Sequence, residues 1–230
     1  MRIRFVLVEP KVPENIGAGA RAIKTMGFDS LVLVNPCEWK EGKARWVAHG
    51  SGDILDSAIV FSTLEEALEG SDFSIATSAK KRTVKNDYVP ASRLKKFLES
   101  KMSSANVVSI VFGREESGLT NDEMKLCDIT ATIEMKTLFP SLNLSQAVML
   151  FAYELSGMKQ AGKSTKTIKE TGSFKALKSR MSTLLKEIGI DESDNRYGRI
   201  LERLSFLSDD DIHLLHSVSA LLSEKFDSEK

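Results

Sequence analysis

The sequence predicts an α/β protein built on a mainly parallel sheet of six strands, with helices on both faces. Two observations support this prediction. Between residues 3 and 157, short apolar runs rich in β-branched residues alternate with segments whose apolar residues recur every three or four positions. Strands that alternate with helices at this spacing form right-handed βαβ units, and helices then cover both faces of the sheet. The expected strands cover residues 3–8, 31–34, 58–61, 73–77, 107–112 and 129–133.

Helix signals lie between these strands. Thr63 and Thr120 are each followed by a glutamate three residues later, which is the capping-box pattern that starts a helix. The first helical segment ends at Gly27, because glycine readily adopts the backbone conformation that stops a helix. The last helical segment before residue 157 is strongly apolar. The expected helices cover residues 15–26, 64–68, 90–98 and 143–155, and a further helix opens after residue 120.

The composition changes after residue 157. Residues 158–173 consist largely of Gly, Ser, Thr and Lys and offer little to bury, so they predict a basic linker. Three amphipathic segments follow, the last with Ser208 as its N-cap, and they cover residues 174–190, 194–207 and 209–226. On this prediction the chain divides into an α/β domain at 1–157, the linker, and an all-α extension at 174–230, which is either a small helical domain or a dimerisation element.

The charge of the chain excludes the simplest argument for nucleic-acid binding. Its 230 residues carry 32 basic and 32 acidic side chains, whereas a strongly basic domain is the usual electrostatic signature of such proteins. Basic residues are concentrated locally, however, with eight in residues 80–101 and eight in residues 158–188. These stretches either follow a phosphate backbone or are the solvated faces of helices.

Several classes of protein and site are disfavoured. No run of about 18 apolar residues exists, and the first ten residues lack the apolar stretch of a signal peptide, so we expect a cytoplasmic protein without a membrane span. Cys37 and Cys127 are too few for a disulfide framework and have no neighbouring ligand for zinc. His213 and His216 lie three apart on an expected helix but lack a third ligand, so no metal is expected.

Three polar segments lie where a parallel sheet binds its ligand, at the carboxyl ends of strands. Residues 9–21 read EPKVPENIGAGAR, residues 111–119 read VFGREESGL and residues 138–145 read LFPSLNLS. A charged cluster directly after a buried strand, as in the second segment, is costly unless it is solvated or used. The second segment has neither the Gly-Lys-Ser/Thr of a Walker loop nor the Gly-x-Ser-x-Gly of a nucleophile elbow.

The first segment allows more than one interpretation. Gly17 and Gly19 suggest a dinucleotide-binding turn, but two prolines separate them from the strand, and the second strand ends in Asn35 rather than in an acid. Small residues here alternatively let the helix pack closely on a neighbour. Asn15 is either a helix cap or a site residue, and Arg21 is either a surface ion-pair former or a site residue.

Together, the three segments resemble the motifs of a known family. They contain, in order, Asn-x-Gly-x-x-x-Arg at 15–21, Gly-x-Glu-x-x-Gly-Leu at 113–119 and Ser-Leu-Asn-Leu-Ser at 141–145. In this order and on this frame of strands and helices, they resemble the motifs of the SpoU (TrmH-type) branch of the SPOUT RNA methyltransferases. Residues 45–52 and 76–79 further resemble the TrmJ/LasT subgroup, whose members carry a helical C-terminal extension.

The resemblance implies a fold, a cofactor and an assembly. It implies a deep trefoil knot at the C-terminal side of the sheet, S-adenosylmethionine bent between loops, and a homodimer in which an Arg of one subunit lies near the cofactor of the other. Matched by position, the cofactor-binding residues are Thr77, Ser78, Ala79, Gly113, Ile133, Pro140, Ser141 and Leu142. The matching catalytic residues are Asn15, Arg21, Glu115, Ser141 and Asn143. The chain departs from TrmJ members at Phe139, where they carry a Tyr.

We therefore expect an S-adenosylmethionine-dependent RNA methyltransferase that acts on the ribose 2'-hydroxyl of tRNA or rRNA. Arg21 is expected to hold the phosphate beside the target ribose rather than to act as a base, because guanidinium stays protonated in proteins. Water, a nearby side chain or His49 would accept the proton. Trp39 and Trp46 are candidates for stacking on bases, and Trp46 equally for the core or a dimer interface. A catalytically inactive RNA-binding protein with this fold is the alternative, and a dinucleotide oxidoreductase is a more distant one.

Overall fold

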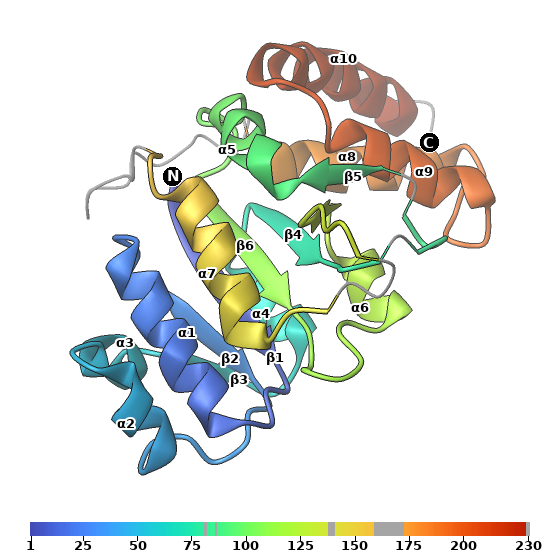
Figure 1. Ribbon diagram of the computed structural model, residues 1–230. Helices are drawn as coiled ribbons and strands as arrows, with labels where there is room; N and C mark the ends of the chain where they lie inside the picture. Colours follow the sequence, from blue (N-terminus) through green and yellow to red (C-terminus); the bar gives the residue numbers. More distant parts are fainter. Residues whose placement is uncertain (81, 86, 138–140, 159–172, 229–230) are drawn as a thin grey trace.

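The structure, a computed structural model, describes residues 1–80, 82–85, 87–137, 141–158 and 173–228. Its centre is a seven-stranded, fully parallel sheet with the strand order β3-β2-β1-β6-β4-β7-β5 (Figure 1). The chain runs outward from β1 to β3 and then crosses to β4 on the other half of the sheet. The strands are β1 (Arg2–Val8), β2 (Leu31–Val34), β3 (Ile59–Phe61), β4 (Phe73–Thr77), β5 (Tyr88–Pro90), β6 (Val107–Phe112) and β7 (Ile129–Thr132).

All six expected strands are present, but the expected number was one too low. The additional strand is β5, at the edge of the sheet beside β7. Three residues are too few to show the alternation of a strand, and the proline at its end predicted only the start of a helix. Pro90 is tolerated there because an edge strand has one side on which no ladder hydrogen bond is needed.

The expected helices of the first 157 residues are also present. Both predicted capping boxes form, since Thr63 and Thr120 each accept a hydrogen bond from the backbone N–H of the glutamate three residues on. Two short helices, α2 and α3, were not predicted, because five or six residues do not establish a helical period. The helices are α1 (Pro13–Thr25), α2 (Lys43–Ala48), α3 (Gly52–Asp56), α4 (Leu64–Glu69), α5 (Ala91–Glu99), α6 (Asn121–Leu126) and α7 (Leu144–Leu155).

Helices cover both faces of the sheet, as expected. Successive side chains of β1 point to opposite faces, and both sets are buried. Phe5 belongs to a large core formed with α1, α5 and α7, whereas Val6 belongs to a smaller core under α4 and α6. Gly17 explains the small residues of α1, because a Cβ there would lie 2.0 Å from the carbonyl oxygen of Ala44 in α2. The close-packing interpretation of these residues is therefore confirmed.

The three helices of the extension form as predicted and pack on the sheet. They are α8 (Phe174–Glu187), α9 (Asn195–Leu204) and α10 (Asp209–Ser228). Phe174 lies in the large core, with its ring centroid 5.1 Å from that of Phe73 in β4. Lys101, after α5, is fully buried beneath the extension and donates a 2.5 Å hydrogen bond to the carbonyl oxygen of Leu207. The extension thus shares its core with the sheet.

Some expectations lie beyond what the described residues test. The predicted linker falls almost wholly on residues 159–172, which lie outside the described part, and the division at 157 stays a prediction. The predicted knot also stays a prediction, since residues 138–140 of the loop before α7 lie outside the described residues. Within the described part, no helix is long and apolar enough to cross a membrane, and no three His, Cys, Asp or Glu side chains gather as a metal site.

Candidate functional site

A cavity of about 300 Å³ opens at the carboxyl ends of three neighbouring strands, β4, β6 and β7. This volume lies at the lower end of the range of about 300–1,000 Å³ that is common for small-molecule sites. Apolar side chains of α7, including Leu144 and Phe151, form part of the lining, and charged side chains lie beside them. Predicted cofactor residues that line the cavity are Thr77, Ser78, Ala79, Gly113, Ile133, Ser141 and Leu142. The remaining one, Pro140, lies outside the described residues.

One wall of the cavity is the glycine loop, residues 113–119, which follows β6. The loop folds back on itself, with paired backbone hydrogen bonds between Arg114 and Gly118. A Cβ on Gly113 would lie 2.1 Å from the carbonyl carbon of Gly118, so no side chain fits there. Gly118 is needed for a different reason, because its φ of +68° is one that side chains disfavour. The two glycines of the motif therefore make this tight turn possible.

Arg114 fixes the glycine loop to the end of β1 and to α6, a role that the sequence did not reveal. Its guanidinium group makes two-pronged ion pairs with Glu9, at 2.7 and 2.9 Å, and with Glu123, at 2.9 and 3.0 Å. The hydrogen bonds to Glu9 and Glu123 raise the pKa of Arg114 and keep it charged. Because its side chain is only 17% exposed, solvent screens these pairs less than it screens surface pairs.

Glu115 binds the first motif to the second. Its carboxylate accepts hydrogen bonds from the side-chain amide of Asn15, at 3.0 Å, and from the backbone N–H groups of Lys11 and Val12, at 3.1 and 3.2 Å. Burial alone would raise the pKa of Glu115, but the bonds from Asn15 and the backbone outweigh it and hold the pKa below its usual value. The residue is therefore ionised at neutral pH.

Asn143 joins the third motif to the same network. Its amide nitrogen donates a 2.8 Å hydrogen bond to the side-chain oxygen of Asn15, and its own oxygen accepts from the backbone and hydroxyl of Ser145. Asn143 is also the N-cap of α7. Asn15, in contrast, is not a cap, because α1 begins after Val12 and the buried amide of Asn15 serves the network instead. The structure thus brings Asn15, Glu115 and Asn143 together.

The other residues predicted from the sequence are not part of this hydrogen-bond network. Arg21 is exposed on α1, outside the cavity lining, and has no hydrogen bond or ion pair within the described residues. Ser141 lines the cavity, but its side chain has no polar partner in the described part. His49 is exposed at the end of α2 and does not line the cavity. Trp39 is a core residue, whereas Trp46 is 70% exposed.

A second residue that the sequence did not reveal is Arg82, on the opposite wall. Its guanidinium group donates to the carbonyl oxygens of Leu119, at 2.7 Å, and Ser117, at 3.2 Å. Arg82 therefore ties the loop after β4 to the glycine loop across the cavity. The only sequence signal was the run of basic residues that starts at residue 80, which predicted contacts with phosphate rather than with backbone carbonyls.

Comparison with known proteins gives this arrangement a context. Residues 2–153 match the SpoU rRNA methylase family, and residues 171–226 match the C-terminal domain described for the tRNA/rRNA methyltransferase LasT. The chain is 41% identical to LasT of Escherichia coli K12, described as an uncharacterized tRNA/rRNA methyltransferase, over 94% of this chain and 95% of that one.

Two further similarities concern TrmJ proteins. TrmJ of Pseudomonas aeruginosa, described as a tRNA (cytidine/uridine/adenosine-2'-O-)-methyltransferase, is 41% identical over 72% of this chain and 65% of its own length. The crystal structure of TrmJ from Z. mobilis matches 97% of this chain and all of that one, with a TM-score of 0.67 and 28% identity. The similarity in fold therefore includes the extension as well as the sheet.

Proposed function

The chain belongs to the SpoU rRNA methylase family, and from this premise we propose that it transfers a methyl group from S-adenosylmethionine to a ribose 2'-hydroxyl of tRNA. TrmJ relatives are described as tRNA 2'-O-methyltransferases. The observation that carries the proposal is the network of Glu115, Asn15 and Asn143, which joins three distant motifs beside one cavity. A tRNA substrate also implies a protein of the cytoplasm.

The residues of the cavity suit S-adenosylmethionine. Backbone groups of Thr77 and Ala79 would meet the adenine edge, and Ile133 and Leu142 would enclose its faces, which explains why charged side chains are not needed there. When bound, this cofactor supplies an electrophilic methyl group on its sulfonium sulfur. The residues of this chain contribute position and electrostatics, because in-line placement of donor and acceptor can account for roughly 7–11 kcal/mol of a barrier.

The network would fix the cavity walls, and Arg21 would bring the substrate. We propose that Arg21 grips the phosphate beside the target ribose with its planar fork and lowers the pKa of the hydroxyl electrostatically. The proton would pass to water or to a nearby side chain, because guanidinium does not release its own proton near neutral pH. Kinetics on Arg21→Lys test this role, and activity close to that of the wild type would argue against the fork.

Arg21 reaches a cavity only if a second subunit is present, so we further propose a homodimer. Helix α1 packs between α2 and α7 (Figure 1). These two neighbouring helices carry exposed apolar side chains. The most exposed are Trp46, at 70%, and Tyr153, at 64%. Large exposed apolar side chains on neighbouring helices are typical of a surface that another protein covers. The dimer would place Arg21 of one subunit at the cavity of the other.

Mixed dimers test this geometry. Arg21→Ala and Asn143→Ala subunits, each inactive alone, are unfolded together and refolded as an equal mixture. Half of the dimers are then mixed, and each mixed dimer has one complete site, so about a quarter of wild-type activity should return. If Arg21 acts within its own subunit, no activity returns. Sedimentation of the wild type checks independently that a dimer exists.

The RNA-binding surface would come mainly from the first basic stretch. The exposed cations there include Lys80, Arg93 and Lys96. In the second stretch, each cation that the structure describes has a partner within the protein. These pairs are Lys175 with the carbonyl of Glu69, Lys178 with Asp128, Arg180 with His216, and Lys186 with Glu192.

The deciding experiment is transfer of labelled methyl from S-adenosylmethionine to tRNA, followed by mapping of ribose methylation. We expect label on a ribose 2'-oxygen. We also expect Arg21→Ala to retain calorimetric cofactor binding, since the proposed partner of Arg21 is the substrate phosphate rather than the cofactor. Binding of tRNA by the wild type without cofactor binding or methyl transfer would instead support the inactive RNA-binding alternative. Label on a base would overturn the ribose assignment.

A further inference from the structure

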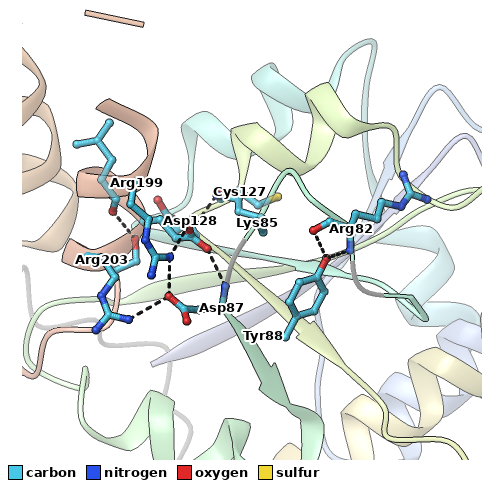
Figure 2. A network of polar contacts seen from close by, with 11 residues as sticks. Arg82, Lys85, Asp87, Tyr88, Cys127, Asp128, Arg199 and Arg203 are labelled. Carbon is cyan, nitrogen blue, oxygen red and sulfur yellow. Dashed lines mark hydrogen bonds and ion pairs between the residues drawn. The ribbon is translucent and has the colours of Figure 1, made fainter. Parts of the chain in front are cut away.

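The loop between β4 and β5, here called the basic loop, connects the cavity to the helical extension. Its described residues are 78–80, 82–85 and 87. The first three of them line the cavity. The last of them, Asp87, lies against α9 of the extension (Figure 2). One end of this loop is therefore a wall of the candidate site, and the other end is a contact of the extension.

The middle of the basic loop is attached at two points, to the edge strand β5 and to the end of α6 (Figure 2). The backbone N–H of Arg82 donates a 2.7 Å hydrogen bond to the hydroxyl of Tyr88 in β5, while its guanidinium group reaches the glycine loop. Lys85 is largely buried and donates to the carbonyl oxygen of Cys127 at 2.8 Å. These bonds hold successive parts of the loop against different elements, so the path of the loop from the cavity to α9 depends on several contacts.

Helix α9 holds the far end of the loop with three hydrogen bonds. Arg199 and Arg203, one helical turn apart, donate to the same carboxylate oxygen of Asp87, at 2.8 and 3.0 Å. The backbone N–H of Asp87 donates to the carboxylate of Glu202 at 3.1 Å. Burial would raise the pKa of Asp87, but hydrogen bonds from Arg203 and Arg199 outweigh it and lower the pKa. The carboxylate is therefore charged at neutral pH.

These contacts do more than attach the extension. The extension is already held by its share of the apolar core, through Phe174 and Leu177, and by Lys101. Arg199 also pairs with the buried carboxylate of Glu202, at 3.1 Å, and this pair contributes to holding α9 together. Arg203 is 60% exposed, and because exposed ion pairs contribute little to stability, its contact with Asp87 is poorly explained as a stabilising pair. What distinguishes the two arginines is their common target, a single residue at the end of the loop that forms the cavity wall.

We propose that Arg199 and Arg203 are positioning residues for methyl transfer, which act through Asp87 to keep the basic loop in the shape that binds S-adenosylmethionine. The proposal rests on the proposed function of the cavity. It gives the extension a role in the reaction itself: α9 supplies part of the rigidity of the cofactor wall, although it contributes no residue to the cavity lining.

Two variants test the proposal without disturbing the core. Asp87→Asn removes the charge that both arginines bind, and Arg203→Ala removes a side chain that is 60% exposed. The matched control is Arg196→Ala, on the same helix, whose guanidinium pairs, among the described residues, only with Asp194 two positions before it. Calorimetry with S-adenosylmethionine, hydrogen exchange of the peptide spanning residues 78–88, and melting temperatures are measured for all of them.

We expect Asp87→Asn and Arg203→Ala to weaken cofactor binding by about three- to tenfold and the control to leave it unchanged, because loss of a contact outside a binding site has a modest effect on affinity. KM for S-adenosylmethionine should rise more than kcat falls, and exchange in the loop should quicken. The double variant should bind no more weakly than Asp87→Asn alone, because Asp87→Asn already disrupts the contact that Arg203→Ala removes.

Cofactor binding by the wild type distinguishes failure of the proposed function from failure of the positioning role. If the wild type does not bind S-adenosylmethionine, the proposed function fails. If it binds while both variants bind equally well with unchanged exchange, the function stands and the positioning role is overturned. A lower melting temperature with unchanged cofactor affinity also overturns it, because the contacts would then only attach the extension.

Discussion

The two walls of the cavity are held in different ways. The glycine loop is fixed from within the sheet region, where Arg114 pairs with Glu9 and Glu123, and Glu115 binds the start of α1. The wall at 77–80 is fixed partly from outside, through the basic loop and α9. The first wall is thus held mainly by β1, α1 and α6, with a further contact from Arg82 of the basic loop, whereas the second is held in part by the extension.

The ion pairs that hold the glycine loop are less exposed than the contact that Arg203 makes with the basic loop. The side chains of Arg114 and Glu123 are each 17% exposed, whereas that of Arg203 is 60% exposed. Salt and water screen exposed pairs far more strongly than buried ones. The comparison teaches that one wall is rigid under most conditions, while the other responds to ionic strength and to changes in the extension.

The largest effect is expected where the rigid wall is overpacked. Gly113→Ala places a Cβ against the backbone of Gly118, and we expect it to lower the free energy of unfolding by about 3 kcal/mol and to abolish cofactor binding. Gly118→Ala is the matched control, because its Cβ meets only Arg82 at 3.8 Å and costs about 1–2 kcal/mol of backbone strain. Urea unfolding measures both, and equal losses would contradict the close approach.

The next largest effect is expected from removal of the carboxylate charge of Glu115, in the glycine loop. Glu115→Gln leaves three N–H donors, those of Asn15, Lys11 and Val12, without a full set of acceptors. Misplacement by about 1 Å can cost about 10²-fold in rate, so we expect kcat for tRNA methylation to fall by about that factor. The exposed Glu99 of α5 provides the control, as Glu99→Gln should retain wild-type kcat.

The pH dependence of this variant has a definite sign. The folded pKa of Glu115 lies below that of an ordinary glutamate, about 4.3, so the stabilisation is present above that value and is lost as pH falls through the folded pKa. The difference in free energy of unfolding between wild type and Glu115→Gln should persist from pH 5 to 8 and shrink below about pH 4. A difference that grows at acid pH would contradict this assignment.

A smaller effect is expected beneath the extension, at Lys101. Burial lowers its pKa to about 8, although Asp209 and Asp128 act in the opposite direction. Between pH 8 and about 10.4 the unfolded chain holds a proton that the folded chain has released, so stability should rise with pH. Relative to Lys101→Met, the wild type should gain at most about 1.4 kcal/mol per pH unit in urea unfolding. Parallel curves for the two proteins would contradict the lowered pKa.

The smallest expected effect is on the salt dependence of tRNA binding, and it distinguishes the cavity region from the extension as the RNA-binding surface. Lys80, at the cavity, has an ammonium group with no partner in the described part of the chain, whereas that of Lys175 donates to the carbonyl of Glu69. Lys80→Ala should reduce the slope of log affinity for tRNA against log salt by about one, and Lys175→Ala should not change it. Filter binding over a salt series measures both slopes, and the reverse order would move RNA binding to the extension.

Sequence reasoning located most of the fold, because the signals for it are local. Buried parallel strands are short apolar runs, and Thr63 and Thr120 carry their capping partners three residues away. The elements it missed, β5, α2 and α3, are too short to show a period. The length of an element, rather than how well it packs, therefore determined whether it could be predicted from the sequence.

The site was harder, since its contacts join residues far apart in sequence. The motif residues that line the cavity were found through family resemblance. The hydrogen bond between Asn15 and Glu115, for example, joins residues 100 positions apart. Arg114 and Arg82 were not singled out, because a basic residue on a loop predicts solvent or phosphate, and only the folded backbone brings Glu9 or Leu119 to them. Ion pairs and carbonyl contacts of this kind leave no pattern in the sequence.

The hydrogen bond between Asn15 and Asn143 spans 128 positions, and the contact of Asp87 with Arg203 forms only after a further stretch of chain has been made. Synthesis adds roughly 5–20 residues per second, so the growing polypeptide spends seconds without a finished donor-binding wall. A nascent or prematurely terminated chain that lacks α9 is then a poor catalyst, even where its sheet has formed. Activity towards RNA would thus report that translation of this chain has passed α9.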